Sequence, residues 1–344
     1  MKKVIETDIL VVGAGPVGLF TVFEAGLLGL HCEIIDNLDK PGGQCSELYP
    51  EKPIYDIPGV AIQTAEEHVN ALLEQIRPFD YNLHLNQRVN SIKKVDDDSW
   101  ELITSEDSLF RTKNIFIAAG GGSFEPRRPP SVKDPDKFLS KGIEYSVKER
   151  DKYQDKDLLI FGGGDSALDW SVELAEVCRS ITLIHRRDAF RGAPNTEKKM
   201  RDLVHLGKIN LKTPFVIESI IGNKKATGAL IKNFATKEIE EISSDEILFL
   251  FGLNKKLGPI LNWNLDLKDN KIKVDTEKFE TSESGIFAVG DINDYPGKLD
   301  LILCGFHETT LAVQHAYKRL NPGEKVPFGY TTSNTKLQKK LGVS

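Results

Sequence analysis

The segment TDILVVGAGPVGLFTVFEAGLLGLHCEIID, residues 7–36, has the order of a strand, a glycine turn, a helix and a second strand. The apolar run at residues 9–12 is typical of a buried parallel strand, and it leads directly into GAGPVG at 13–18. In such a GxGxxG turn the first glycine permits the bend, the second admits a pyrophosphate, and the third allows close helix packing. The segment therefore predicts a dinucleotide-binding unit whose cofactor-binding residues include Gly13, Gly15, Pro16 and Gly18.

An acidic residue ends the second strand of this unit. Asp36 closes the segment HCEIID, where a carboxylate can accept hydrogen bonds from both hydroxyls of a ribose. The complete order of strand, turn, helix, strand and acid is far more specific than a glycine pattern alone. Asp36 is therefore predicted to bind the ribose of the dinucleotide.

The same pattern recurs at residues 156–190, KDLLIFGGGDSALDWSVELAEVCRSITLIHRRDAF. A second apolar strand leads into GGGDSA at 162–167, with alanine as an allowed third residue of the fingerprint. The position that matches Asp36 is His185, so this unit lacks the acid and continues with arginines. A carboxylate there would repel a 2′-phosphate, whereas guanidinium groups match it, and the second unit is therefore predicted to prefer NADP(H). Its predicted NADPH-binding residues are Gly162, Gly164, Asp165, Ser166, His185, Arg186, Arg187 and Arg191.

The composition sets limits on the class of protein. With 344 residues, the chain can form two compact domains. Its net charge of −6 argues against a general nucleic-acid binder, because phosphate binding normally needs a basic excess. No apolar run approaches the ~18 residues of a membrane helix, and no signal-peptide pattern follows the N-terminus, so we expect a cytoplasmic protein.

Several motifs together resemble, from end to end, the two-domain flavoprotein reductases of the thioredoxin-reductase type. They are GAGPVG with Asp36, GGQ at 42–44, NIFIAAGGGSF at 114–124, HRRDAFR at 185–191 and GIFAVGDIND at 285–294. The resemblance implies an α/β fold of two doubly wound, three-layer, Rossmann-like nucleotide-binding domains, with FAD in the first unit and NADPH/NADP⁺ in the second. It also implies that the FAD domain is discontinuous, at 1–120 and 252–344, around an NADPH domain at 121–251.

The cysteines depart from the thioredoxin-reductase pattern. The stretch at 140–159, where those enzymes carry a CxxC, contains no cysteine. In the other disulfide-reductase design Cys45 would need a partner five positions on, and that residue is Pro50. A dithiol mechanism requires an attacking and a resolving thiol, so reduction through an internal cysteine pair is not expected. Cys45 is instead expected to fill space in a buried position.

Without the dithiol, the chain most closely resembles the thioredoxin-reductase-like ferredoxin–NADP⁺ reductases, which carry a C-terminal extension. In that family a tyrosine of an LYPEK motif, here Tyr49, covers one flavin face, and an aromatic residue of the partner subunit's extension, matched by Tyr330, covers the other. A hydroxyl residue beside flavin N5 is matched by Thr331 and Thr332. The catalytic residues implied are Tyr49, Tyr330 and Thr331. The FAD contacts implied are Gln44, Tyr49, Val89, Phe124, Asp291 and Thr332.

The resemblance implies electron transfer between NADP(H) and ferredoxin, or flavodoxin, by hydride transfer at flavin N5 followed by single-electron steps in a homodimer. Because ferredoxins are typically acidic, a local basic patch is expected. The candidates are Arg127, Arg128, Lys198, Lys199, Arg201, Lys336, Lys339 and Lys340. Two alternatives stay open: a disulfide or low-molecular-weight thiol reductase that uses Cys45 or Cys304 singly, and a flavin- and NADPH-binding redox sensor without turnover.

Overall fold

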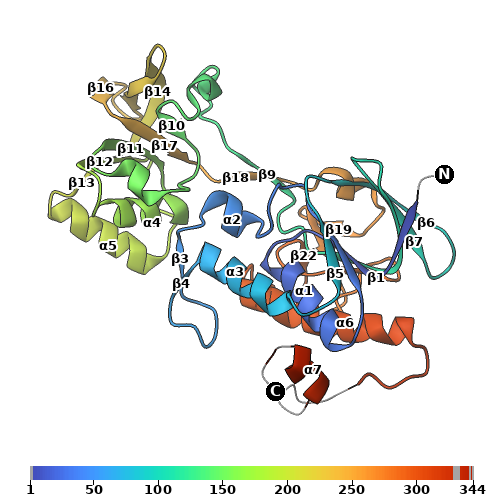
Figure 1. Ribbon diagram of the computed structural model, residues 1–344. Coiled ribbons are helices and arrows are strands. Elements are labelled where there is room, and N and C mark those ends of the chain that lie inside the picture. The colour runs from blue at the N-terminus through green and yellow to red at the C-terminus, as the bar shows by residue number, and fades with distance from the viewer. Residues whose placement is uncertain (1–2, 328–333, 341, 343–344) are drawn as a thin grey trace. The chain divides into compact units, whose positions relative to one another are not determined.

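The computed structural model describes residues 3–327, 334–340 and 342. The chain forms two compact units (Figure 1). One combines the chain up to Ser123 with the chain from Lys255 onward, and the other is Phe124–Asn254. Each boundary between the two units lies a few residues after the domain boundary expected from the sequence. In the described ranges, no helix combines the length and the apolar character needed to cross a bilayer.

The first unit is built on a sheet whose parallel strands follow the order β5, β2, β1, β8 and β21, and β7 and β6 extend β8 in antiparallel fashion. Its main strands are β1 (Val4–Val12), β2 (Cys32–Ile35), β5 (Tyr81–His84), β6 (Val89–Lys94), β7 (Trp100–Thr104), β8 (Leu109–Ile117) and β21 (Ile286–Ala288). Its helices are α1 (Pro16–Leu27), α2 (Gln44–Leu48), α3 (Ala65–Ile76), α6 (Ile302–Leu320) and α7 (Thr335–Lys340). Short strands complete it: β3 (Pro53–Ile54), β4 (Gln63–Thr64), β19 (Leu267–Lys268), β20 (Lys271–Lys273) and β22 (Asn293–Asp294).

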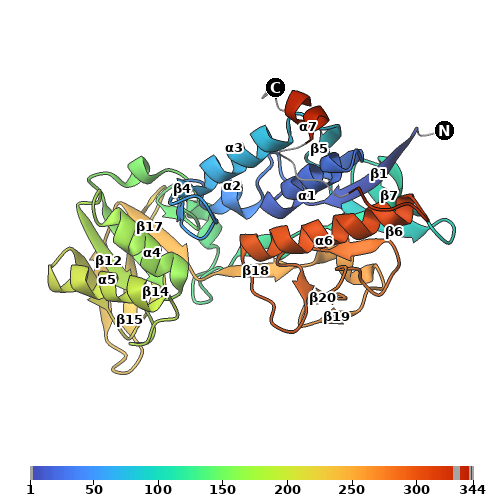
Figure 2. The same cartoon turned by 90° about the horizontal axis from the view of Figure 1, so that it is seen from below.

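Two cores lie on opposite faces of this sheet. On one face α1 lies between α3 and α6 (Figure 2), and apolar residues such as Leu19 and Val313 pack with Val11 and Phe116 of the sheet. On the other face the core includes a short 3₁₀ turn at Gly258–Asn262 and apolar residues of the chain that follows it, such as Trp263, Leu265 and Ile272.

The second unit has the same plan. Its parallel sheet has the order β10, β17, β11, β12 and β13, with α4 and α5 on one face and an antiparallel sheet β14-β15-β16 on the other. The elements are β10 (Ile143–Glu144), β11 (Asp157–Gly162), α4 (Asp165–Leu174), β12 (Ser180–Ile184), α5 (Pro194–His205), β13 (Ile209–Lys212), β14 (Phe215–Gly222), β15 (Ala226–Asn233), β16 (Ile239–Ser243) and β17 (Glu246–Leu250). The crossing strands β9 (Ser123–Pro126) and β18 (Leu253–Lys256) pair with each other.

The predicted α/β fold with parallel sheets is confirmed. In both units the strand order reverses beside the strand that leads into the glycine turn, between β1 and β8 and between β11 and β17. Open α/β sheets bind ligands outside the carboxyl ends of the strands at such a reversal. The two glycine turns lie at these points, because one directly follows β1 and the other directly follows β11.

A buried carboxylate joins β2 to the edge strand β5. The side chain of Glu33 accepts hydrogen bonds from His84 Nε2 at 2.5 Å, Asn82 Nδ2 at 2.8 Å and His31 Nε2 at 3.0 Å. Burial opposes ionisation, but these hydrogen bonds outweigh it and lower the pKa of Glu33 from 4.5 to about 2. The folded state is therefore stabilised by this group above pH 4.5, and the contribution is lost as the pH falls towards 2.

The variant E33Q is expected to unfold with a free energy that depends less on pH below 4.5 than that of the wild type. At neutral pH, E33Q should be less stable by roughly 2–3 kcal/mol, and the difference should shrink in acid. Urea titrations at several pH values between 3 and 7 measure this. The exposed Glu74, changed to Gln, is the matched control and should run parallel to the wild type. An E33Q curve that also stays parallel would contradict the prediction.

Candidate functional site

The glycine turn of the first unit packs too closely for side chains at two of its positions. Gly13 has φ +112°, and a Cβ there would lie 2.5 Å from the carbonyl oxygen of Ala118. A Cβ on Gly18 would lie 1.9 Å from the carbonyl oxygen of Gly13. These two glycines are therefore required by packing alone.

The middle glycine is different. A Cβ on Gly15 would meet nothing in the described chain within 4 Å, and its φ of −70° is open to any residue. Gly15 is the N-cap of α1, no side chain caps the helix start, and the first turn carries no acid. The free N–H groups of the helix start thus face an open space, which fits a pyrophosphate.

Asp36 lies where β2 ends. Its Oδ2 accepts from the Ala14 N–H at 2.6 Å and its Oδ1 accepts from the Leu38 N–H at 2.8 Å. Burial raises the pKa of Asp36, and the backbone hydrogen bonds from Leu38 and Ala14 act against that rise. The carboxylate is thereby fixed beside the glycine turn, which suits a ribose-binding acid.

The loop that begins with Gly42 and Gly43 packs on the same turn. Both glycines have positive φ, +110° and +56°, the Gly42 N–H donates to the Ala14 carbonyl at 2.8 Å, and a Cβ on Gly43 would lie 3.2 Å from Cα of Gly15. The loop then continues as the short helix α2, which begins at Gln44 and ends before Tyr49. The sequence predicted a loop here; the helical turn is an addition.

The GIFAVGDIND motif joins this cluster. Gly290 follows β21 with φ +80°, and a Cβ there would lie 3.3 Å from a side-chain carbon of Val17 in the glycine turn. Burial is the largest cause that raises the pKa of Tyr49 and of Cys45, and the nearby charge of Asp291 is a smaller cause that raises both. The structure therefore brings the turn, the GGQ loop and Asp291 together.

Other predicted flavin contacts are placed less directly. The side chain of Val89, at the start of β6, packs in the core with Trp100 and Leu102 and is therefore buried. Phe124 lies in β9. Tyr330, Thr331 and Thr332 lie outside the described residues.

In the second unit the turn again has closed and open positions. A Cβ on Gly162 would lie 2.6 Å from Leu250, and one on Gly163 would lie 2.3 Å from the His185 ring. Among the residues that the structure describes, a Cβ on Gly164 would meet nothing within 4 Å, and Gly164 is the N-cap of α4 without a side-chain cap. This open helix start fits a second pyrophosphate.

The arginine loop is pinned to this turn. The Arg191 N–H donates to the Gly163 carbonyl at 2.8 Å, and Oδ1 of Asp165 accepts from the Ala193 N–H at 2.9 Å. Earlier in this loop the side chains of Arg186 and Arg187 are exposed, and within the described part of the chain their guanidinium groups have no acidic partner. They are therefore available to an external anion. Ser166 is exposed in the first turn of α4.

The cysteines give no dithiol. All four are free, and Cys45 is only 3% exposed. Burial raises the pKa of Cys45 to about 11, which disfavours the thiolate that nucleophilic sulfur chemistry needs. The expectation that Cys45 is buried is confirmed.

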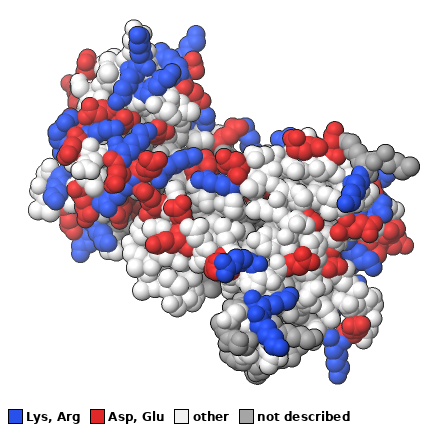
Figure 3. All heavy atoms as spheres, in the orientation of Figure 1, with Lys and Arg blue, Asp and Glu red and all other residues white. Residues whose placement is uncertain are grey.

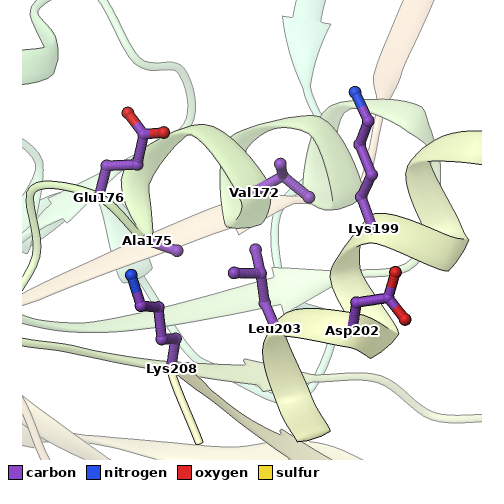
Figure 4. A pocket seen from close by; sticks show the side chains of 7 residues that line it. All are labelled: Val172, Ala175, Glu176, Lys199, Asp202, Leu203 and Lys208. Atoms are coloured by element: carbon purple, nitrogen blue, oxygen red, sulfur yellow. The ribbon is translucent and has the colours of Figure 1, made fainter. Parts of the chain in front are cut away.

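One pocket lies on the helical face of the second unit. Its volume is about 280 Å³, and α4 and α5 supply most of its wall. In Figure 4 the apolar side chains of Val172 and Leu203 face each other across it, with Lys199 and Lys208 at its sides. Of the residues singled out in the sequence, only the candidate docking cation Lys199 lines it, and no predicted cofactor-binding residue does, so we assign it no part in coenzyme binding.

The candidate docking cations are partly neutralised within the chain. Arg128 pairs with Asp136 at 2.9 Å, and Arg201 pairs with Glu197 at 2.8 Å. On the face shown in Figure 3, Lys and Arg side chains are interspersed with Asp and Glu over the second unit. A uniform basic patch does not form on that face.

Comparison with known proteins places the chain in a family. A profile described as pyridine nucleotide-disulphide oxidoreductase matches residues 7–317. The chain is 48% identical over 344 residues to a protein named ferredoxin–NADP reductase from Nitrobacter hamburgensis, covering all of both chains. It is 50% identical over 343 residues to one of the same name from Mesorhizobium japonicum, covering 100% of this chain and 99% of the relative.

Solved structures agree on the fold. Thioredoxin reductase from T. acidophilum superimposes with a TM-score of 0.78 at 21% identity, covering 91% of this chain and 98% of that one. The enzyme from Lactococcus lactis gives 0.77 at 24% identity, covering 91% and 99%. With the full-length similarity above, the chain belongs to the pyridine nucleotide-disulphide oxidoreductase family and, within it, to the ferredoxin–NADP reductases of the thioredoxin-reductase-like type.

Proposed function

We propose that this chain transfers electrons between NADP(H) and ferredoxin, or flavodoxin, with FAD held by the first unit and the nicotinamide coenzyme by the second. The full-length similarity to proteins named ferredoxin–NADP reductase carries this proposal. The two unlike nucleotide turns support it, because one is followed by Asp36 and the other by the exposed Arg186 and Arg187. The chemistry that a bound flavin supplies is the exchange of one hydride for two single electrons.

The chain's own residues bind and orient the cofactors. The open helix start at Gly15 receives the pyrophosphate, Asp36 the ribose hydroxyls, and Asp291 the ribitol. The side chain of Gln44 lies next to Gly120, since a Cβ built on Gly120 would be 3.5 Å from the Nε2 of Gln44. Gln44 is therefore within reach of the same cluster. Tyr49 covers one face of the flavin ring and keeps water from it. At the second unit, Gly164 receives the pyrophosphate and the arginines bind the 2′-phosphate.

Anaerobic stopped-flow tests the proposal as a whole. The yellow protein is reduced with NADPH and then mixed with ferredoxin, with flavodoxin or with thioredoxin in separate runs. We expect rapid reoxidation by ferredoxin or flavodoxin and none by thioredoxin. Reoxidation by thioredoxin or a small disulfide would favour a thiol reductase, and negligible turnover with every acceptor would favour a redox sensor.

The variants C45A and C304A are expected to keep ferredoxin reduction by NADPH within about twofold of the wild type. The reason is that Cys45 is buried with a raised pKa, and neither cysteine has a disulfide partner. The measurement is the steady-state rate with ferredoxin as acceptor. A loss of most of the activity in either variant would instead support the single-cysteine thiol reductase.

We also propose a homodimer, as the resemblance implies. Light scattering on the purified protein should then give a mass of twice 38.4 kDa. A monomer in solution would remove the basis for placing Tyr330 on the flavin of a partner subunit.

A further inference from the structure

The loop that carries Asp291 is tied to a single buried carboxylate, that of Glu308 in α6. Its Oε2 accepts from the Gly290 N–H at 2.7 Å and from Asn293 Nδ2 at 2.8 Å. Its Oε1 accepts from the Tyr295 hydroxyl at 2.9 Å and from the ammonium of Lys298. The side chains of Glu308 and Lys298 are 0% and 4% exposed. Four donors from one loop therefore converge on one carboxylate away from water.

Two of these four donors flank Asp291, one on each side. Gly290 precedes it, and Asn293 follows two residues later. Asn293 is fully buried, and its Nδ2 also donates to the Ala288 carbonyl at 2.9 Å while its own N–H donates to the Gly290 carbonyl at 3.2 Å. The backbone around Asp291 is thus held from both ends by groups that Glu308 anchors.

The helix that carries Glu308 is fixed against the glycine turn. A Cβ on Gly305, one turn before Glu308, would lie 2.4 Å from a side-chain carbon of Val17 and 3.2 Å from Cα of Gly290. Val17 belongs to the GAGPVG turn. The phosphate-binding turn, the start of α6 and the Asp291 loop therefore meet at one point, and a shift of the loop changes the position of Asp291 relative to the turn.

Burying an ion pair gains little stability over well-packed apolar side chains, whereas a fully satisfied network fixes one geometry. We propose that Glu308, with its charge balanced by Lys298, is a positioning residue that sets Asp291 for the ribitol of FAD. This inference rests on the proposed function, because it takes the first unit as the FAD site. Glu308 acts through the loop and does not itself contact the flavin.

The test compares E308Q with Y295F. Y295F removes one donor from the same carboxylate, on the oxygen that does not hold Gly290 and Asn293. FAD release on dilution of the purified holoprotein is followed by flavin fluorescence, and the unfolding temperature of each flavin-free variant is recorded. We expect the dissociation constant for FAD to rise about 30-fold in E308Q and less than about threefold in Y295F. The visible spectrum of the flavin still bound should shift in E308Q only.

A third variant, D291A, separates the assignment of the FAD site from the positioning role of Glu308. If D291A leaves FAD affinity unchanged, the assignment of this flavin site fails. If D291A weakens binding but E308Q does not, the positioning role of Glu308 is overturned. The positioning role is also overturned if E308Q and Y295F lose FAD affinity in the same proportion to their fall in unfolding temperature. That pattern would mark a purely structural role for Glu308.

Should E308Q not fold, N293A takes its place. It removes the donor next to the Asp291 turn and leaves the pair of Glu308 with Lys298 intact. We expect a rise of about tenfold in the FAD dissociation constant, and an unchanged value overturns the inference.

Discussion

Replacing Arg186 and Arg187 together by glutamine is expected to lower kcat/KM for NADPH by about 10²- to 10³-fold, while kcat/KM for NADH stays within about threefold. Both side chains are exposed and have no acidic partner in the described part of the chain, so they are free to bind an anion. The loop that carries them is fixed to the glycine turn by the Arg191 N–H, which lets two forked guanidinium groups meet a 2′-phosphate without reordering the backbone. NADH has no such phosphate and should lose little.

The matched control is the double variant K208Q/K224Q, which removes the same two charges from exposed positions of the same unit. If the arginines act only through the general field of the unit, this control should lower NADPH efficiency to a similar extent. If they bind the 2′-phosphate directly, the control should leave it nearly unchanged. Steady-state titrations of both coenzymes with one acceptor at constant ionic strength measure the difference. Equal losses for NADPH and NADH in the arginine variant would contradict the NADP(H) assignment.

The glycine turns could be predicted because their determinants are local in sequence. Gly13 and Gly18 belong to one short segment, and the clash that forbids a side chain at Gly18 is with the carbonyl of Gly13. Asp36 follows the next strand, and the backbone N–H that it accepts is that of Ala14, inside the same βαβ unit. The absence of a dithiol could be predicted for the same reason, since spacing alone excludes a CxxC.

What the sequence did not indicate depends on distant contacts. In the sequence, Glu308 is one acidic residue of an amphipathic helix. The residues next to it in the chain do not indicate that Lys298 and Asn293 donate hydrogen bonds to it from a preceding loop. The β layer on the second face of the second unit's sheet was not specified either. Its strands β14, β15 and β16 lie after the βαβ pattern in the chain, and their packing against β11 and β17 depends on contacts between segments that are distant in sequence. The helical turn α2 was missed since its five residues are too few for a periodic pattern.

Two of the three glycines of the first turn, Gly15 and Gly18, predict opposite consequences for the same substitution. In G18A the new Cβ would lie 1.9 Å from the Gly13 carbonyl oxygen, so the backbone must shift and the flavin-free protein should unfold at a clearly lower temperature. In G15A the Cβ meets nothing within 4 Å in the described chain and the φ of −70° suits alanine. Alanine is a weaker N-cap than glycine but is less flexible in the unfolded chain, so the flavin-free protein should stay within about 1 kcal/mol of the wild type.

G15A should nevertheless lose FAD. The methyl group would occupy the space above the helix start where the pyrophosphate approaches the backbone, and we expect the FAD dissociation constant to rise by about 100-fold or more, so that the protein is purified nearly colourless. Flavin content, FAD titration and thermal unfolding of both variants measure this. The ligand explains a glycine that no atom of the described chain crowds, yet whose replacement removes the cofactor without a matching loss of stability. A G15A protein that keeps its full flavin content would therefore mean that the pyrophosphate does not lie over this turn.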